Sequence, residues 1–242
     1  MINPLSIYKT LFFLIGFFFS NSIFCINNFV LISAPGSGKG TFSQYLVEHH
    51  GYLQICPGDL FRHEIAIGSD LGIKIQPIVD RGDYVDEEIV CELIAKYVDK
   101  AKNQKKGFII DGFPRSSVSF DFLCSLMEKY KVKKDTYILQ FIASDNLCID
   151  RILKRLVCTK CFKVYSKKAP DQKILKSCTT CGTSLTERKA DTMAIVLKRL
   201  KYFHTHIEPL IQIAEKKFKV KKLQSEQTQS SLKAQYEKLL ND

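Results

Sequence analysis

A glycine-rich run at residues 33–41 is the clearest indication of chemical function in this sequence. It is Ser-Ala-Pro-Gly-Ser-Gly-Lys-Gly-Thr. Glycines let backbone N–H groups converge on phosphate oxygens, and the positive end of a following helix strengthens the attraction. Lys39 would neutralise the outer phosphates, and Thr41 would hold Mg²⁺ directly or through water. The pattern predicts a phosphate-binding loop. Its other lining residues are Gly36, Ser37, Gly38 and Gly40.

The segments on either side place this loop between a strand and a helix. Residues 29–32 are a short apolar run typical of a buried strand, and Phe42, Tyr45 and Leu46 share one face of a helix. This context distinguishes a phosphate-binding loop from the alternative, a glycine-rich turn after a buried strand. Ser33 stands where such loops usually have glycine, which predicts a less permissive entry turn.

Further charged groups follow two other predicted strands. Asp111 comes directly after the apolar run 108–110, where its carboxylate could anchor Mg²⁺ through water. Arg115 lies four residues further on, and Arg62 follows a separate strand. A guanidinium is a planar fork that suits phosphate oxygens. Surface ion pairs would explain either arginine alone, but the set predicts a second anionic ligand.

Four cysteines form two closely spaced pairs within residues 157–185. They are Cys158, Cys161, Cys178 and Cys181, so that two CxxC pairs are separated by sixteen residues. This spacing predicts a tetrahedral structural zinc, which would supply the folding energy of a stretch with few apolar residues. Disulfides and an iron–sulfur cluster are the alternatives. The other cysteines are expected to be mostly buried hydrophobes; they stand at positions 25, 56, 91, 124 and 148.

Short apolar strands alternate with helix-length segments along the rest of the chain. The predicted strands are residues 29–32, 52–55, 108–110, 137–142 and 218–223. Segment 230–240 places apolar residues on one face and predicts a closing helix. The alternation indicates a parallel sheet with helices on both faces. The predicted fold class is α/β, in three α/β/α layers of the P-loop NTPase type.

The composition is that of a folded domain with an excess of positive charge. The 242 residues are 45% hydrophobic and 25% charged, enough for one domain with a substantial core and a small insert. The net charge of +11 suits anionic nucleotides. A nucleic-acid or membrane surface is the alternative, and the lysines of 216–222 are expected to be a solvated helix end and strand.

The N-terminus departs from this ordinary composition. Residues 11–19 are a nine-residue apolar run after Lys9, short for a transmembrane helix and similar to the core of a secretory signal. Residues 1–25 are therefore predicted to be a signal peptide or an N-terminal anchor, with an extra hydrophobic strand or helix as the alternative. A signal would lead to the secretory pathway or an organelle. An uncleaved anchor would hold the protein at a membrane, and a cytoplasmic location is the further alternative.

In this order, the motifs resemble those of the adenylate kinase family in its long-lid, zinc-bearing form. The resemblance covers residues 29 to about 240. Its motifs are 33–41 (GxPGxGKGT in the family), 58–62 (TGDxxR), 82–85 (GxLV), 111–115 (DGFPR) and the runs 150–155 and 185–191 that enter and leave the lid. The resemblance implies a kinase core at 29–242. An insert for the nucleoside monophosphate (NMP) would lie at about 57–86, and the lid at about 154–191.

The resemblance implies reversible transfer of the γ-phosphoryl group of ATP, or GTP, to AMP with Mg²⁺. Such a transfer depends on positioning and charge neutralisation, and zinc would brace the moving lid. The implied catalytic residues are Lys39, Asp111, Arg155, Arg188 and Arg199. The implied ATP-binding residues are Gly36, Ser37, Gly38, Lys39, Gly40, Thr41, Arg151 and Arg155. The implied AMP-binding residues are Pro57, Arg62, Asp83, Val85, Gly112, Arg115, Ser119, Arg188 and Arg199. A monomer without nucleic acid is expected, with membrane contact only through an uncleaved anchor.

The departures from the family pattern fall mainly on the acceptor-base pocket. Pro57 replaces a threonine, Ser119 a glutamine, and Ala190 the first of two aspartates. Loss of a hydrogen-bond partner from a buried base costs about 1–3 kcal/mol, roughly ten- to hundredfold in selectivity. We therefore expect an active kinase with a shifted or weakened acceptor preference. A non-catalytic nucleotide-binding protein and a zinc-bearing nucleic-acid binder are the alternatives.

Overall fold

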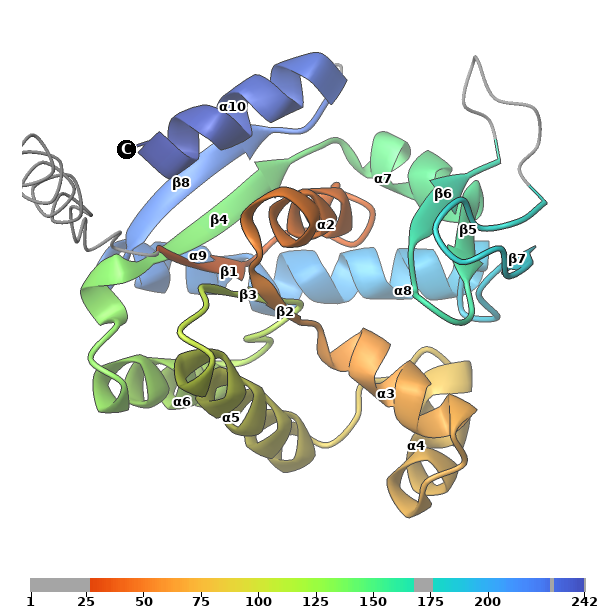
Figure 1. Ribbon diagram of the computed structural model, residues 1–242, viewed down its shortest axis with the longest axis horizontal. Coiled ribbons are helices and arrows are strands. Elements are labelled where there is room, and N and C mark those ends of the chain that lie inside the picture. The colour runs from red at the N-terminus through yellow and green to blue at the C-terminus, as the bar shows by residue number, and fades with distance from the viewer. Residues whose placement is uncertain (1–26, 168–175, 227–228, 242) are drawn as a thin grey trace, which may run out of the picture.

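A five-stranded parallel sheet forms the centre of the computed structural model, which describes residues 27–167, 176–226 and 229–241 (Figure 1). The strand order is β2-β3-β1-β4-β8. The strands are β1 (Asn28–Leu31), β2 (Leu53–Ile55), β3 (Phe108–Asp111), β4 (Thr136–Ile142) and β8 (Lys219–Gln224). All five predicted strands are confirmed, each to within one residue at either end.

The three central strands, β3, β1 and β4, are mostly apolar because both faces of the sheet are covered there, whereas the edge strand β8 carries three lysines. β1 lies between β3 and β4, and its Val30 pairs with Ile110 and Ile138. Val30 faces one hydrophobic cluster, whereas its neighbours Phe29 and Leu31 face the other. Strands buried on both sides read as continuous hydrophobic runs, which is why the sequence predicted them well.

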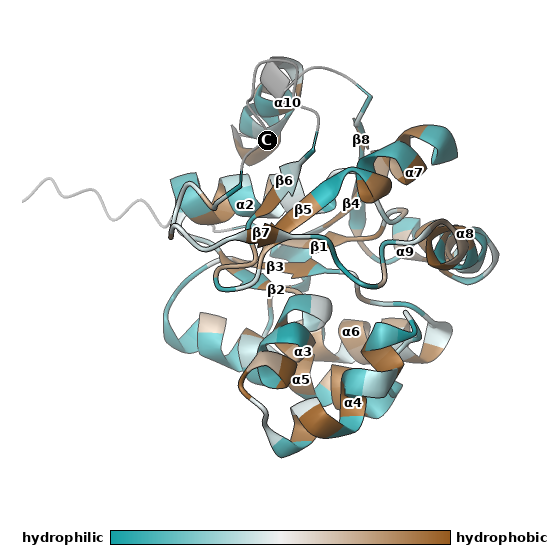
Figure 2. Ribbon diagram, turned by 90° about the vertical axis from the view of Figure 1, so that its right-hand side faces the viewer, coloured by the Kyte–Doolittle hydropathy of each residue, from teal (hydrophilic) through white to brown (hydrophobic). Residues whose placement is uncertain are grey.

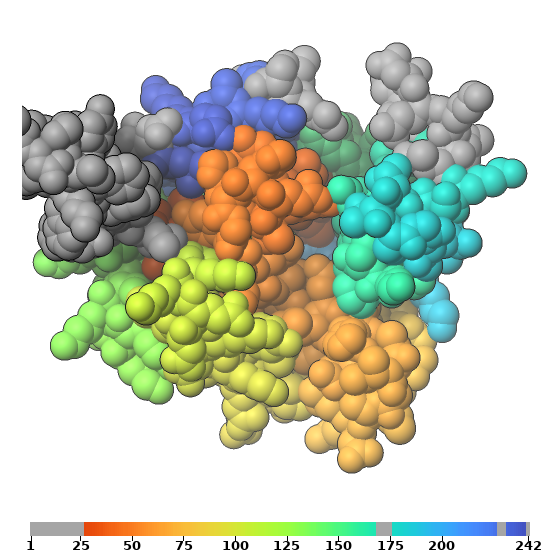
Figure 3. Space-filling model, viewed as in Figure 1, coloured from red at the N-terminus to blue at the C-terminus, as the bar shows by residue number. Residues whose placement is uncertain are grey.

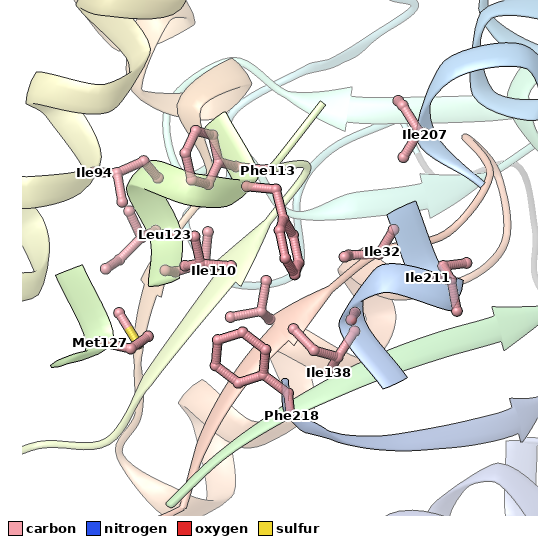
Figure 4. Packing of buried hydrophobic residues seen from close by; sticks show 14 of the residues in the cluster. Ile32, Ile94, Ile110, Phe113, Leu123, Met127, Ile138, Ile207, Ile211 and Phe218 are labelled. Carbon is pink, nitrogen blue, oxygen red and sulfur yellow. The ribbon is translucent and has the colours of Figure 1, made fainter. Parts of the chain in front are cut away.

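Helices cover the two faces of the sheet in separate layers (Figure 2). On one face lie α2 (Lys39–His50) and α10 (Gln229–Asn241). On the other lie α5 (Glu87–Asn103), α6 (Ser117–Lys129), α8 (Met193–Tyr202) and α9 (Pro209–Glu215). A π-helical turn, Phe203–Ile207, joins α8 to α9, and a short 3₁₀ turn, Lys133–Asp135, precedes β4. Figure 4 shows the larger core, in which Ile110, Phe113, Ile138 and Phe218 meet between the layers. The predicted three-layer α/β/α class and the closing helix are confirmed.

Two smaller units project from the sheet at the ends of the strands (Figure 1). The predicted insert at 57–86 contains α3 (Pro57–Ala66) and α4 (Asp70–Asp80). The predicted lid at 154–191 follows α7 (Asp145–Leu153) and contains an antiparallel sheet in the order β6-β5-β7. Its strands are β5 (Arg155–Cys158), β6 (Val164–Ser166) and β7 (Leu185–Thr186).

The prediction for residues 1–25 lies outside the described residues and stays a prediction. Within the described ranges, no helix has the length and apolar character needed to cross a membrane.

Candidate active site

The glycine-rich loop turns tightly before α2. Gly36 and Gly38 have φ angles of 83° and 102°, which residues with a Cβ rarely adopt. A Cβ at Gly36 would also lie 2.4 Å from the carbonyl oxygen of Cys148 in α7. The Oγ of Ser37 is buried and has no hydrogen-bond partner among the described residues. Because a buried hydroxyl needs a partner, Ser37 fits a phosphate oxygen brought by a ligand.

Ser33 at the loop entry adopts an ordinary backbone conformation, so the smaller freedom expected of a serine there causes no strain. Its φ is not positive. Its Oγ accepts a hydrogen bond from the backbone N–H of Phe141 in β4, at 2.6 Å. The side chain therefore continues the pairing between β1 and β4 beyond the last residue of β1.

Lys39 and Asp111 place opposite charges in a poorly solvated region at the ends of β1 and β3. The Nζ of Lys39 donates to the carbonyl oxygens of Ser33 and Ala34, at 3.2 and 2.9 Å. Burial lowers the pKa of Lys39, against the attraction of Asp111. Burial also raises the pKa of Asp111, again with Lys39 opposing the shift. Lys39 can thus neutralise phosphate, and the carboxylate of Asp111 with the hydroxyl of Thr41 offers the oxygen ligands that Mg²⁺ prefers.

Two arginines from the insert and the lid share one carboxylate. Arg62 in α3 forms an ion pair with Asp59, and Nη2 of Arg188 lies 3.5 Å from Oδ1 of the same Asp59. Burial, followed by the charges of Arg62 and Arg155, lowers the pKa of Arg188 to about 10. The Nε atoms of Arg62 and Arg188 are buried without a partner in the described part of the chain. This crowding of cations favours an added anion, and Figure 3 shows the hollow between α2, the α3–α4 insert and the lid in which it would bind.

Arg155 and Arg199 are held from opposite sides of the same region. Arg155 donates from Nε and Nη2 to the two carboxylate oxygens of Asp191, at 2.8 and 2.6 Å. The Nε of Arg199 donates to the carbonyl oxygen of Gly82 at 3.3 Å. Burial lowers the pKa of Arg199, and the positive charges of Arg115 and Arg155 lower it further. The predicted catalytic arginines Arg155, Arg188 and Arg199 are therefore brought together, and hydrogen bonds orient the guanidinium groups of Arg155 and Arg199.

Arg115 is fixed by its own turn and by an aromatic ring. Its Nε donates to the carbonyl oxygen of Gly112 at 2.7 Å. Its guanidinium lies over the ring of Tyr84, 4.4 Å from the centroid. Tyr84 in turn contacts Tyr202 of α8, with ring centroids 4.6 Å apart. This cation–π contact orients Arg115, the residue predicted to bind the acceptor phosphate, from outside the site.

Arg151 is positioned by Ser225, which follows β8. Its Nη1 donates to the Ser225 Oγ at 3.0 Å, and its Nη2 donates to the Ser225 carbonyl oxygen at 2.6 Å. The hydroxyl of Ser225 donates to the carbonyl oxygen of Ser37 in the phosphate loop. One serine, only 1% exposed, thus connects the phosphate loop to the arginine predicted to stack on the donor base.

The two departures in the acceptor pocket have structural roles of their own. Pro57 is the first residue of α3, where a missing N–H costs nothing. Ser119 is fully buried near the start of α6, and its Oγ accepts from the backbone N–H groups of Arg115 and Ser116, both at 3.0 Å. The bond from Ser116, with the reciprocal bond from the Ser119 N–H to the Ser116 Oγ, forms a capping box. The predicted contact of Ser119 with the acceptor base stays a prediction, and it would compete with this cap.

The remaining predicted AMP ligands are Asp83 and Val85 at the exit from the insert and Gly112 after β3. The carboxylate of Asp83 accepts from Nε of Arg81 at 3.1 Å and from Nζ of Lys198 at 2.6 Å, so its charge is already paired. Val85 follows it and is half-buried. Gly112 has φ 81°, and a Cβ there would lie 3.2 Å from Nη2 of Arg115. Their contacts with AMP also stay predictions.

The four lid cysteines meet at one point. They are Cys158, Cys161, Cys178 and Cys181, and none of them is in a disulfide. Their sulfurs lie within 4.8 Å of one another, with individual separations of 3.4, 3.4 and 3.7 Å. Zn–S bonds of about 2.3 Å in a tetrahedron place the sulfurs about 3.8 Å apart, whereas a disulfide needs about 2.05 Å. Backbone N–H groups of Cys161 and Thr180 point at two of the sulfurs at 3.4 Å, which favours thiolates. The donor set fits one zinc ion.

Several site residues were absent from the sequence-based set. Asp59 lies inside the 58–62 motif, so the sequence indicated that it is near the site. Its ion pairs with both Arg62 and Arg188 could not be predicted. Tyr84 also lies inside a motif. The side-chain hydrogen bonds of Ser225 could not be predicted, because they join segments 188 and 74 residues apart in the chain.

The fold and the site together define a nucleotide-binding phosphotransferase of the P-loop class. Residues 31–219 match the family described as adenylate kinase. The chain is 35% identical over 195 residues to a protein described as "Adenylate kinase" from Paramagnetospirillum magneticum (strain ATCC 700264 / AMB-1), over 80% of this chain and 89% of that protein. The chain belongs to the adenylate kinase family and is a nucleoside monophosphate kinase, as the motifs predicted.

Proposed function

We propose that this kinase transfers the γ-phosphoryl group of ATP to AMP and catalyses the reverse reaction. The convergence of arginines from separate elements carries this proposal. The positive charges of Arg62 and Arg155 add to burial in lowering the pKa of Arg188. Those of Arg115 and Arg155 do the same for the pKa of Arg199. Several cations in one poorly solvated region suit two phosphate chains that meet at the transferring group.

The roles follow from where each side chain is held. Lys39 and the loop N–H groups would bind the donor phosphates, and Arg62 with Arg115 would hold the acceptor phosphate. Arg155, Arg188 and Arg199 would stabilise charge on the transferring group, and closure of the lid would exclude water. Mg²⁺, held by Asp111 and Thr41 with the nucleotide, would supply further charge neutralisation.

A phosphotransfer assay on the full chain tests this function. ATP or GTP is paired with AMP, GMP, CMP or UMP, and Lys39→Ala is compared with Lys74→Ala, an exposed lysine in α4. We expect turnover with AMP that Lys39→Ala loses and Lys74→Ala keeps. Nucleotide binding without turnover for any pair would instead support a non-catalytic protein.

We also propose a weakened preference for the acceptor base. Pro57 offers neither hydroxyl nor N–H, and the hydroxyl of Ser119 is engaged in the α6 cap. With these groups unavailable, discrimination by base contacts should fall roughly ten- to hundredfold while phosphate contacts remain. The same assay measures this as the ratio of kcat/KM values. A strong preference for AMP over the other three monophosphates would contradict it.

Zinc at the four cysteines is the last part of the proposal. The ion would hold β5 and the two CxxC turns together as a structural brace, as the sulfur spacing supports. We expect about one zinc per chain by elemental analysis, lost in Cys178→Ser and kept in Cys91→Ser, whose thiol lies outside the cluster. Iron in place of zinc, or disulfides among the four lid cysteines, would refute it.

A further inference from the structure

Lysines collect at the edge of the sheet where the parallel strands begin. The loops that enter β3, β4 and β8, residues 104–107, 129–135 and 215–219, contain nine lysines and two acidic residues. We name this surface the strand-entry face. Its lysines are Lys105, Lys106, Lys129, Lys131, Lys133, Lys134, Lys216, Lys217 and Lys219. All are exposed except Lys133, which is half-buried.

Little of this charge is neutralised within the described residues. Lys133 pairs with Glu128 at 2.8 Å, and Lys217 pairs with Asp121 at 3.5 Å. The ion pairs of the described part of the chain do not include Lys106, Lys134 or Lys216. A groove of about 460 Å³ runs between the β4 and β8 loops and is lined by their lysines. The face is therefore a concentrated positive surface that suits an anionic partner.

The chain enters β1 in the middle of this face. β1 lies between β3 and β4 in the sheet, and its first residue, Asn28, pairs with Thr136 of β4. The Oδ1 of Asn28 also accepts from the backbone N–H of Phe108, the first residue of β3, at 3.2 Å. Figure 1 shows the starts of β1, β4 and β8 together, on the side away from the lid. The sequence preceding β1 contains the apolar run 11–19.

We propose that the strand-entry face docks on an anionic lipid membrane, and that the apolar run 11–19 supplies the second membrane-binding signal. A nine-residue run is too short to span a bilayer. Stable attachment without a spanning helix takes two signals, typically an apolar insertion beside a polybasic surface. The sequence supplies both, since the apolar run precedes β1 in the chain and the start of β1 is flanked by lysine loops on both sides.

The composition of the face favours lipid headgroups over nucleic acid. Its three loops contain no arginine, the residue that binds nucleic-acid phosphates and bases in fixed geometry. Phe218 and the neighbouring Tyr137 are 8% and 5% exposed, so neither can stack on a base. Docking through this face also leaves the phosphate loop, the insert and the lid free, because they lie at the opposite ends of the strands.

Vesicle partitioning of the full chain tests the proposal. Neutral phosphatidylcholine vesicles are compared with vesicles containing phosphatidylserine, at low ionic strength. The test variant is Lys106→Gln/Lys134→Gln/Lys216→Gln, one lysine from each loop. The control is Lys74→Gln/Lys96→Gln/Lys233→Gln, exposed lysines on α4, α5 and α10 that remove the same charge. Phosphotransfer in solution reports that both variants are folded.

We expect the wild type to prefer anionic vesicles, and the test variant to lose on the order of 100-fold of its partition coefficient on them. The fold-loss of the partition coefficient in the control variant should be less than about a third of that in the test variant, because the control lysines are dispersed over the surface. Equal losses in the two triple variants, or an unchanged test variant, would overturn the proposal. Loss of polynucleotide binding with unchanged vesicle binding would assign the face to nucleic acid instead.

Discussion

Replacing Ser225 with alanine tests how the donor side of the site is organised. The substitution removes two hydrogen bonds made by the side chain, one accepted from Nη1 of Arg151 and one donated to the carbonyl oxygen of Ser37. It leaves the bond from Nη2 of Arg151 to the backbone carbonyl oxygen of residue 225. The variant therefore disconnects the phosphate loop from Arg151 without removing either of them.

The magnitude follows from the kinds of bond that are lost. A hydrogen bond to a charged group contributes about 1.5–3 kcal/mol, and one between neutral groups about 0.5–1.5 kcal/mol. Because the remaining bond keeps the guanidinium close, values at the low end apply, for a total of about 2 kcal/mol. We expect the free energy of unfolding to fall by this amount. We also expect the KM for ATP to rise roughly tenfold, since the loop and Arg151 are less well ordered.

A double-mutant cycle with Arg151→Ala is the decisive measurement. The free energy of unfolding from urea titration and the KM for ATP are measured for both single variants and the double variant. If Ser225 acts through Arg151, the two changes should couple by about 1 kcal/mol or more. Ser125→Ala, an exposed serine in α6, should change stability by less than about 0.5 kcal/mol. Additive effects of Ser225→Ala and Arg151→Ala would refute the proposed connection.

Three further predictions concern stability, acceptor binding and pH. Phe42→Ala should lower the free energy of unfolding by about 3–5 kcal/mol, measured by urea denaturation, because its ring projects from α2 into the core and is fully buried. Tyr84→Leu should raise the KM for AMP about three- to tenfold with kcat nearly unchanged, because Arg115 loses its cation–π contact; a fall in kcat alone would contradict this. Hydrogen bonds to Glu208 and then Asp145 raise the pKa of His204. Its stabilisation is therefore complete below about pH 6.5 and lost as pH rises through the raised pKa. His204→Gln should destabilise the fold more at about pH 6 than at about pH 9; equal losses would contradict it.

The sequence predicted the sheet well because burial on both faces leaves a strong signal. The central strands β1, β3 and β4 are mostly apolar runs, and the site residues cluster in motifs at the strand ends, so Lys39, Asp111 and Arg62 could be assigned to one edge. The lid cysteines were equally visible, because two CxxC pairs can be recognised as a metal-binding pattern without knowledge of the surrounding fold.

Contacts between distant segments could not be predicted in the same way. The bond from Ser225 to the phosphate loop depends on where β8 ends relative to β1, and no local pattern encodes that distance. Ser119 shows a different limit. Its motif position indicated a base contact, whereas its hydroxyl caps α6, and a short side chain can satisfy one role or the other.

The hydrogen bond from Phe141 to Ser33 has a consequence for protein engineering. Consensus design would replace this serine by the glycine typical of the family loop, on the expectation of greater stability. Here that change would leave the buried N–H of Phe141 without its acceptor, at a cost of about 1–3 kcal/mol, and would add backbone freedom to the unfolded chain. In this chain the consensus residue would therefore be the destabilising choice.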